Sequence, residues 1–263
     1  MCGTCGCGTD DNDPTILKPG EQPHNHTHDG VHFHSHEHSE HTHEHSHQHR
    51  VLEVEQDILQ HNAVMAARNR GYFEAKNILA LNLVSSPGSG KTSVLEKTLA
   101  DLSTEIPFYV IEGDQQTLND ANRIDALKIP VIQINTGKGC HLESDMVYNA
   151  VKKLNIIDHA VLMIENVGNL VCPSMFDLGE SKRVVILSTT EGEDKPIKYP
   201  DMFHTSDICI INKIDLLPYL NIDIDKLKNY ALKVNPNLQF FEISATTGEG
   251  MEKWYKWLKK NLV

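Results

Sequence analysis

Apolar residues are spread unevenly along this chain of 263 residues. The first fifty contain almost none, whereas the rest alternates short apolar runs with amphipathic stretches, as folded domains do. The opening part is therefore predicted to be a disordered tail rich in Cys and His, because it cannot bury a core. We divide the chain into a Cys-rich motif at 1–8, a His-rich tail at 9–50, a helical segment at 51–77 and an α/β domain at 78–263.

The spacing of apolar residues predicts the helices and strands. In the segment 51–77, Leu52, Ile58, Leu59 and Met65 recur at roughly helical intervals. Seven apolar runs predict strands at 78–84, 108–112, 131–134, 159–165, 183–187, 207–211 and 239–242. Amphipathic stretches predict helices at 92–102, 118–127, 142–154, 224–234 and 250–262. Near-continuous apolar strands between helices indicate an α/β fold, a mostly parallel sheet with helices on both faces. Such sheets bind ligands at the carboxyl ends of their strands.

The first predicted strand of this sheet runs into a glycine-containing loop and then a helix, the context that a phosphate-binding loop (P-loop) requires. The loop comprises Ser85, Ser86, Pro87, Gly88, Ser89, Gly90, Lys91 and Thr92, and Ser93 follows it. Gly88 and Gly90 let backbone amides turn toward an anion at the helix amino end. Lys91 is placed to reach the β- and γ-phosphates, and Thr92 to ligate Mg²⁺. The alternative, a plain serine–glycine turn, is disfavoured by the strand and the Lys–Thr pair, although Ser85 replaces the usual Gly.

A second nucleotide motif, Asn-Lys-Ile-Asp, begins at Asn212 directly after the sixth predicted strand. The carboxylate of Asp215 can accept two parallel N–H bonds from guanine, a pair that adenine does not offer, so Asp215 is predicted to select GTP over ATP. Asn212 would brace the loop, and Lys213 would pack along the base. Ser244 and Ala245 follow the next strand and suit a backbone contact to guanine O6; an ordinary helix entry is the alternative.

Two acids join Lys91 as candidate catalytic residues. Asp114 follows the second predicted strand and Glu165 ends the fourth, so both are expected at strand carboxyl ends, facing the phosphates. Asp114 is predicted to orient Mg²⁺ through water or to position the attacking water, and Glu165 to hold the outer shell of the metal. The two roles are interchangeable on this evidence. A helix cap or a solvated acid is the alternative for each.

Charge narrows the possible partners. The formal net charge is −12, and the tail up to Arg50, with eight acidic and two basic residues, carries −6 of it. We therefore expect no nucleic-acid partner, because such binding needs a basic face. The first residues do not resemble a signal peptide, and no run approaches a membrane span, so a cytoplasmic protein with reduced thiols is expected. Clustered thiols in that setting indicate metal or redox chemistry.

The tail offers metal ligands of two kinds. Cys2, Cys5 and Cys7 place three thiolates within six residues, which suits Ni²⁺ in a planar site or Zn²⁺ in a tetrahedral one. Twelve of the sixteen His lie between His24 and His49, mostly at every second position. Imidazole suits zinc, copper and nickel, so a reservoir for several ions is predicted. An unstructured Cys-rich end and a merely solubilising tail are the alternatives.

A third set of candidate ligands lies inside the domain. Cys140 and His141 precede the third of the α/β-domain helices, and Cys172 lies in the loop after Glu165. Both segments follow strand ends near the predicted nucleotide site, so the three residues could share a metal ion, with a fourth ligand from water or a second subunit. Packing residues are the alternative. Cys209, inside an apolar strand, is assigned to the core.

Together these motifs resemble the hydrogenase nickel-incorporation GTPases of the HypB family, over nearly the whole chain. The resemblance rests on the Cys2/Cys5/Cys7 motif, the His tract, the P-loop at 85–92 and the segments at 112–117, 133–141, 165–173 and 212–215. It implies a P-loop GTPase of the SIMIBI class that dimerises when nucleotide is bound. It also implies a tight nickel site at the amino-terminal Cys motif and a weaker Ni/Zn site at Cys140, His141 and Cys172 in the dimer interface.

The resemblance further implies a function: a GTP-hydrolysing metallochaperone that binds and stores nickel and delivers it for assembly of the [NiFe]-hydrogenase active site. GTP/GDP, Mg²⁺, Ni²⁺ and Zn²⁺ would be its ligands. The partners implied are the nickel chaperone HypA, the accessory protein SlyD and the hydrogenase large subunit. Two alternatives remain open, a nickel storage protein with a vestigial GTPase and a urease-type nickel-insertion GTPase.

Overall fold

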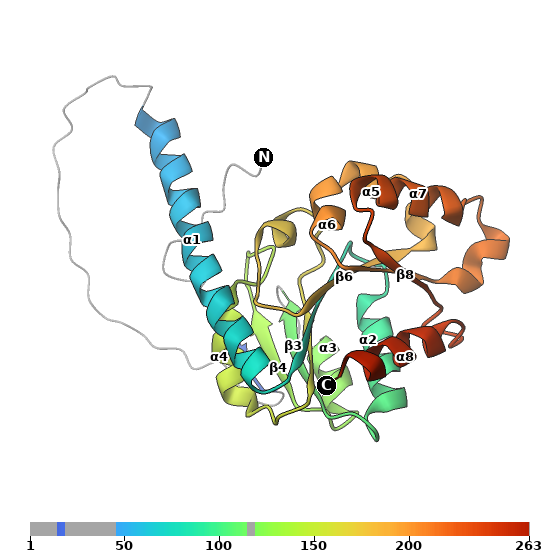
Figure 1. The fold of residues 1–263 in the computed structure, drawn as a ribbon, viewed down its shortest axis with the longest axis horizontal. Helices are drawn as coiled ribbons and strands as arrows, with labels where there is room; N and C mark the ends of the chain where they lie inside the picture. Colours follow the sequence, from blue (N-terminus) through green and yellow to red (C-terminus); the bar gives the residue numbers. More distant parts are fainter. Residues whose placement is uncertain (1–14, 19–45, 115–118, 263) are drawn as a thin grey trace.

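The computed structural model describes residues 15–18, 46–114 and 119–262, which build one eight-stranded sheet (Figure 1). Its strands are β1 (Thr15–Leu17), β2 (Leu79–Ser85), β3 (Phe108–Asp114), β4 (Val131–Asn135), β5 (Val161–Glu165), β6 (Lys182–Ser188), β7 (Ile208–Asn212) and β8 (Gln239–Glu242). Their order is β1-β4-β3-β5-β2-β6-β7-β8. All adjacent strands pair in parallel except β1, which pairs antiparallel with β4. The predicted mostly parallel sheet is confirmed.

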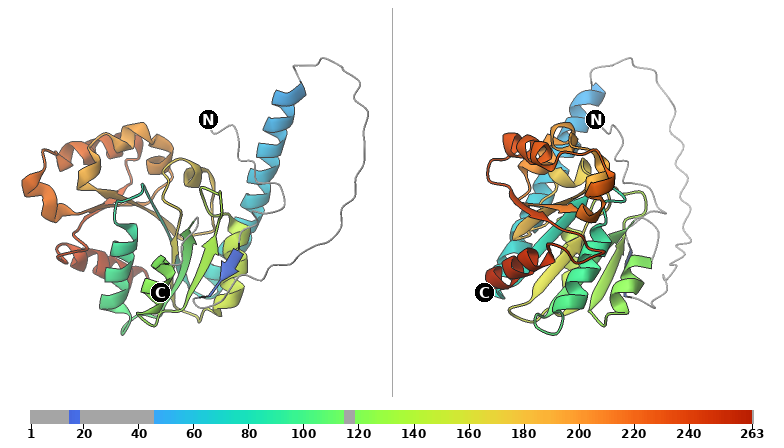
Figure 2. Two further views of the ribbon diagram at one scale, coloured as in Figure 1. Left: turned by 180° about the vertical axis from the view of Figure 1, so that it is seen from behind. Right: turned by 90° about the vertical axis from the view of Figure 1, so that its right-hand side faces the viewer.

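Helices cover both faces of this sheet, also as predicted (Figure 1, Figure 2). They are α1 (Ser46–Ala75), α2 (Lys91–Leu102), α3 (Asn119–Asp125), α4 (Ser144–Leu154), α5 (Lys195–Lys198), α6 (Pro200–His204), α7 (Ile224–Val234) and α8 (Met251–Asn261). On one face α2, α3 and α8 pack with alternate strand residues such as Leu81 and Val110. On the other, α1 and α4 enclose Ala80 and Ile111, while α6 and α7 enclose a third cluster. Burial on both faces explains the near-continuous apolar strands.

The second half of α1 is anchored to the rest of the protein. Asn62 Oδ1 accepts a hydrogen bond from Ser144 N at 2.9 Å, and Asn69 Nδ2 donates to Ser144 O at 2.7 Å. Arg70 Nη2 lies 2.8 and 2.7 Å from the two carboxylate oxygens of Asp177. The first half of α1 extends past the body in both views (Figure 1, Figure 2). The polar anchors are satisfied, as buried amides must be.

Two parts of the segment predicted to be disordered take regular structure. Thr15–Leu17 forms the edge strand β1, where Ile16 packs against the α1/α4 cluster and its carbonyl accepts from Lys153 Nζ at 2.9 Å. Helix α1 begins at Ser46, five residues before the predicted start at 51. A three-residue strand has no readable periodicity, and its backbone pairing with β4 only exists in the assembled sheet.

The sequence also missed the short helices between β5 and β8. These are α5, α6 and the 3₁₀ turns η1 (Cys172–Met175), η2 (Thr189–Glu191) and η3 (Ile214–Tyr219). Elements of three to six residues are too short to show a helical period. The strand predicted to begin at His159 begins at Val161, because His159 has a φ of 56° and ends a turn.

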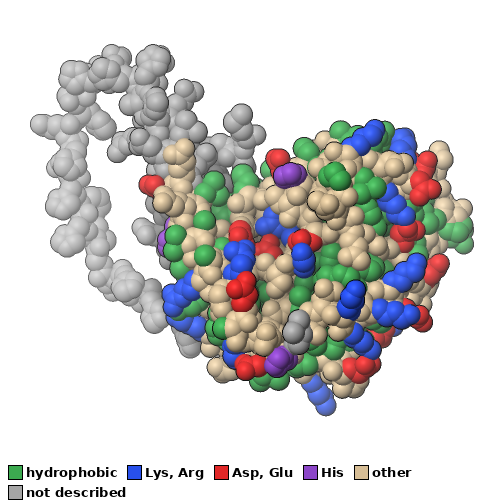
Figure 3. All heavy atoms as spheres, in the orientation of Figure 1, with side chains coloured by type: hydrophobic (Ala, Val, Ile, Leu, Met, Phe, Trp, Pro, Cys, Tyr) green, Lys and Arg blue, Asp and Glu red, His purple; other side chains and the backbone are tan. Residues whose placement is uncertain are grey.

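The surface carries charge of both signs. On the face shown in Figure 3, Lys and Arg side chains are interspersed with Asp and Glu. None of the helices in the described part of the chain has the length and apolar character needed to cross a bilayer.

Candidate nucleotide and metal site

The P-loop joins β2 to α2 at the carboxyl edge of the sheet. Gly88 and Gly90 have φ values of 79° and 88°, a region that side chains disfavour, and Gly90 caps the amino end of α2. A Cβ on Gly90 would lie 2.5 Å from Asn212 Nδ2, so a larger residue does not fit there. Asn212 Nδ2 donates to Ser89 O at 3.0 Å. The two motifs predicted from sequence therefore lock together directly.

The Asn-Lys-Ile-Asp loop is braced from several sides. Lys213, in the left-handed conformation with a φ of 65°, donates to Gly88 O at 2.8 Å. Asn212 Oδ1 accepts a hydrogen bond from Ala245 N at 3.1 Å, so the backbone amide of Ala245 helps to brace the loop. The predicted contact of the Ser244–Ala245 backbone with guanine O6 stays a prediction. Ser244 beside it is buried. Asp215 Oδ1 is buried without a hydrogen-bond partner among the described residues, which suits an acceptor for a ligand N–H.

Glu165 and Lys91 meet at the floor of the P-loop. Lys91 Nζ lies 3.0 Å from Glu165 Oε1 and donates a short hydrogen bond to the carbonyl oxygen of Asn166. Thr92 Oγ1 donates to the same carboxylate oxygen of Glu165 at 2.7 Å. The other oxygen, Oε2, is buried and has no partner in the described structure. A hydroxyl and a carboxylate with a spare oxygen are donors that fit Mg²⁺.

Asp114 lies at the carboxyl end of its strand, as expected, although β3 extends two residues beyond the predicted end at 112, and the Asp114 carbonyl oxygen accepts from Thr136 N at 2.9 Å. Residues 115–118, which follow it, lie outside the described residues. A cavity of about 260 Å³ is lined by residues 85–93, Glu165, Gly168 and Arg123. Arg123, on α3, was not identified as a site residue from the sequence, because nothing in its local pattern distinguishes it from an ordinary basic residue on a helix surface.

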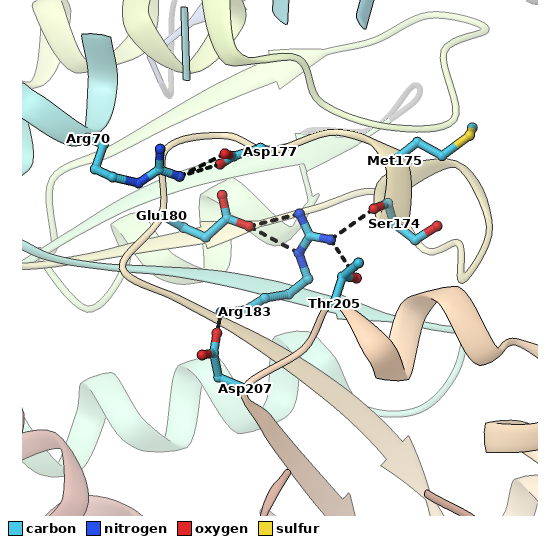
Figure 4. A pocket seen from close by; sticks show the side chains of 8 residues that line it. All are labelled: Arg70, Ser174, Met175, Asp177, Glu180, Arg183, Thr205 and Asp207. Carbon is cyan, nitrogen blue, oxygen red and sulfur yellow. Dashed lines mark hydrogen bonds and ion pairs between the residues drawn. The ribbon is translucent and has the colours of Figure 1, made fainter. Parts of the chain in front are cut away.

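A larger pocket, about 290 Å³, lies elsewhere (Figure 4). Its lining residues are Arg70, Ser174, Met175, Asp177, Glu180, Arg183, Thr205 and Asp207. The charges there are already paired, since Arg70 bonds Asp177 and Arg183 bonds Glu180. Asp207 pairs with Lys182 at 2.8 Å. The smaller cavity is formed by the P-loop and contains Glu165 Oε2, which has no hydrogen-bond partner among the described residues, so the nucleotide is still expected there.

The structure brings Cys140, His141 and Cys172 together. One ligand atom from each lies within 4.8 Å of the others, and Cys140 Sγ is 3.6 Å from His141 Nδ1. His141 and Cys172 are each 6% exposed, while Cys140 is half-buried. His141 Nε2 has no hydrogen bond among the described residues, and its ring stacks on Phe176 at 3.8 Å between centroids. Two sulfurs and an imidazole in this arrangement can hold a soft divalent metal.

Asn166 links the two halves of the site, a role that its sequence position did not reveal. Its Oδ1 accepts from Leu142 N at 3.1 Å and from Val167 N at 3.0 Å. Leu142 directly follows the Cys140–His141 pair, and Val167 begins the loop that leads to Cys172. The same residue offers its carbonyl to Lys91. The metal-ligand loops and the P-loop thus share one buried residue.

The other Cys and His residues singled out from the sequence fall into two groups. Cys2, Cys5, Cys7 and the His24–His45 part of the predicted His24–His49 tract lie outside the described residues, so the metal sites expected there stay predictions. Cys209 is buried in β7, and burial raises the pKa of its thiol. Its assignment to the core agrees with this environment.

Comparison with known proteins identifies the family. Residues 79–242 match the family described as CobW/HypB/UreG, nucleotide-binding domain. The hydrogenase maturation factor HypB of Escherichia coli K12 is 56% identical over 210 residues, which is 80% of this chain and 72% of that protein. This chain belongs to the HypB family. The probable HypB of Methanocaldococcus jannaschii is 39% identical over 212 residues, covering 81% of this chain and 96% of that protein.

Solved HypB structures share the fold. The crystal structure of HypB from Archaeoglobus fulgidus has a TM-score of 0.72 and 37% identity, and it covers 78% of this chain and 100% of that one. HypB from Helicobacter pylori, crystallised in complex with nickel, has a TM-score of 0.71 and 38% identity over 76% of this chain and 94% of its own. The resemblance drawn from the motifs is thereby confirmed.

Proposed function

We propose that this chain is a GTP-hydrolysing metallochaperone that binds and stores nickel and delivers it for assembly of the [NiFe]-hydrogenase active site. One observation carries the proposal: ligand atoms of Cys140, His141 and Cys172 cluster within 4.8 Å in a HypB-family chain whose P-loop shares a buried residue with them. HypB relatives include one crystallised with nickel. In this proposal the GTPase drives the uptake and release of the metal.

The nucleotide chemistry follows from the site. Backbone amides of the P-loop and the α2 amino end would bind the phosphates, with Lys91 neutralising the β- and γ-groups. Thr92 and Glu165 would hold Mg²⁺, which would neutralise charge that develops on the phosphates. Asp114 would position the attacking water, or exchange that role with Glu165. Asp215 would accept the guanine N–H pair, with Lys213 packing along the base and Ser244 near O6.

The metal chemistry follows from the ligand types. Thiolate and imidazole suit both Ni²⁺ and Zn²⁺, and three ligands leave a position open for water or a second subunit. An incomplete shell suits delivery, because a closed shell would hold the ion too tightly to release it. Cys140 is half-buried, so a ligand from outside the protomer can approach it. Nickel is thus cargo, transiently held.

The decisive experiment measures coupling between the two ligands. Nickel affinity is determined with GDP and with a non-hydrolysable GTP analogue, on full-length chain carrying Ala at positions 2, 5 and 7. A difference of about 100-fold, equivalent to about 2.7 kcal/mol, is expected. Cys140→Ala is the control that assigns the difference to the internal site. Equal affinities in the two nucleotide states would sink the proposal.

The alternatives are separated by two further measurements. A storage protein with a vestigial GTPase would show the same GTP turnover in wild type and Lys91→Ala, whereas our proposal expects turnover to be lost in the variant. A urease-type insertion GTPase would bind urease rather than the hydrogenase large subunit in a pull-down.

HypA and SlyD are the other partners that we propose, and we propose the cytoplasm as the location. The proposed nucleotide-dependent homodimer is checked by sedimentation with GDP and with the analogue, where an unchanged mass would refute it.

A further inference from the structure

The strongest unassigned feature is Asn166, which is 0% exposed and lies directly after the candidate catalytic Glu165. Its side-chain oxygen holds two backbone amides, Leu142 N at 3.1 Å and Val167 N at 3.0 Å. Each amide belongs to a different metal-ligand loop. One buried acceptor therefore sets the separation between the Cys140–His141 pair and the start of the loop that carries Cys172.

The main-chain carbonyl of the same residue contacts the P-loop. Lys91 Nζ donates to Asn166 O while it lies 3.0 Å from Glu165 Oε1. A bound γ-phosphate would offer Lys91 a full negative charge in addition to Glu165, and the attraction between two opposite charges exceeds that between the ammonium and a neutral carbonyl. Lys91 would then release the carbonyl of Asn166. The following peptide, whose Val167 N is held by Asn166 Oδ1, would shift together with this residue when the contact changes.

A second connection reaches the third ligand through buried polar groups. Asn166 Nδ2 donates to Asn82 Oδ1 at 3.3 Å, and Asn82 Nδ2 donates to Glu180 Oε1 at 3.0 Å. Glu180 holds the guanidinium of Arg183 at 3.0 Å (Figure 4).

Arg183 in turn fixes the chain beyond Cys172. It donates to Ser174 O at 3.2 Å and to Phe176 O at 2.8 Å, and the Phe176 ring stacks on His141. All three ligands therefore lie on segments tied to one hydrogen-bonded network that begins at Asn166.

We propose that Asn166 is the positioning residue that couples the nucleotide state to the geometry of the Cys140/His141/Cys172 site. This rests on the proposed function, because it presupposes that nucleotide and metal affect each other. The side chain of Asn166 hydrogen-bonds Leu142 N, Val167 N and Asn82, none of which is a candidate nucleotide or metal ligand. It transmits the position of Lys91, through its own carbonyl and side-chain oxygen, to both metal-ligand loops. Coupling of this kind requires two arrangements of the element, and the exchange of the Lys91 acceptor provides them.

The test uses reciprocity, since nickel must change nucleotide affinity by the factor by which nucleotide changes nickel affinity. Affinities for a fluorescent non-hydrolysable GTP analogue and for GDP are measured on full-length chain with and without saturating Ni²⁺, and the preference between the two nucleotides with Ni²⁺ is compared with that without it. We expect the ratio of these preferences to be about 100-fold in wild type, the factor expected above. Asn166→Ala should bring it close to one. Asn69→Ala is the matched control. It removes another buried Asn, whose side chain donates to the carbonyl oxygens of Ser144 and Leu178, and it should keep the wild-type ratio.

The outcomes are distinguishable. A wild-type ratio of one refutes the proposed function and the inference with it. A wild-type ratio above one that Asn166→Ala retains overturns the inference alone, as does an equal loss in Asn69→Ala.

If Asn166→Ala fails to fold, amide hydrogen exchange on the wild-type chain decides. The amides of Leu142 and Val167 should exchange at different rates with GDP and with the analogue. Unchanged rates at both amides would overturn the inference.

Discussion

Asp215 is the side chain that we expect to select the nucleotide. Its buried Oδ1 has no hydrogen-bond partner in the described structure, and the surrounding loop is fixed by Asn212 and Lys213. A buried acceptor without a partner binds more tightly to a base that donates N–H groups to it, and binding a base without them leaves the acceptor unpaired at a cost in free energy.

Replacing this carboxylate should change the base preference. Asp215→Asn is expected to weaken GTP binding by about 10²- to 10⁴-fold, because the amide cannot accept both guanine N–H groups. Xanthine carries a carbonyl in place of the 2-amino group, so the Asn amide can donate to it, and XTP affinity should rise. Competition binding with GTP, XTP and ATP measures this. Unchanged GTP affinity would show that Asp215 does not read the base.

The cysteines of the domain offer a matched pair for testing metal binding. Cys140→Ala removes one of three clustered ligands and should lower nickel affinity at this site at least about 100-fold, the upper range seen for outer-shell losses. Cys209→Ala should leave nickel affinity unchanged and cost about 1 kcal/mol of stability through a small cavity. Burial raises the pKa of Cys209, so iodoacetamide should label Cys140 and spare Cys209. Nickel loss in Cys209→Ala would contradict this assignment.

At the scale of elements, the anchoring of α1 depends on polar contacts that the hydrophobic pattern did not show. Asn62 and Asn69 reach Ser144, and Arg70 reaches Asp177. A helical segment at 51–77 was predicted from its apolar spacing, but neither its start at Ser46 nor its docking was predicted. The partners lie 75 to 107 residues away in sequence, so no local signal identifies them.

The Arg70–Asp177 pair makes the stability of this contact depend on pH. Burial raises the pKa of Asp177, but hydrogen bonds from Arg70 and Gly179 N and the charge of Arg70 outweigh it, so the pKa is lowered. The pair should therefore stabilise the fold above the unfolded Asp pKa of about 3.9, and lose this contribution as pH falls through the lower folded value. Asp177→Asn should cost about 0.5–1 kcal/mol at pH 7, since the pair is partly exposed.

Urea unfolding of wild type and Asp177→Asn at pH 7 and near pH 3 measures this dependence. The difference should shrink at the lower pH. A difference that stays constant across the range would assign the effect to packing rather than charge.

At the scale of the whole molecule, the chain combines two predicted functions, delivery by the GTPase domain and storage by the His tract. Deleting residues 9–50 should lower the number of nickel ions bound per chain and leave GTP turnover unchanged. The deletion also removes β1 and the start of α1, so circular dichroism must confirm the fold first. Equilibrium dialysis gives the stoichiometry. If the stoichiometry does not fall, the tail is not a reservoir.

The sequence by itself determined the parallel α/β fold, the P-loop and the guanine motif. Each is recognised from residues that are adjacent in sequence, because the apolar periodicity and the residue types of a strand, a loop and a helix follow one another along the chain. It also named Cys140, His141 and Cys172 as candidates, because each follows a predicted strand end, and strand ends meet at one edge of a parallel sheet.

Only the tertiary structure decided that these three side chains converge within 4.8 Å and that Asn166 joins them to Lys91. It also decided that the Gly90 position admits no side chain, because of Asn212, over 120 residues away. These contacts depend on the strand order β4-β3-β5-β2-β6-β7, which brings residues distant in sequence to one edge of the sheet. A buried amide and its partners carry no local pattern, since their hydrogen bonds exist only once the sheet is assembled.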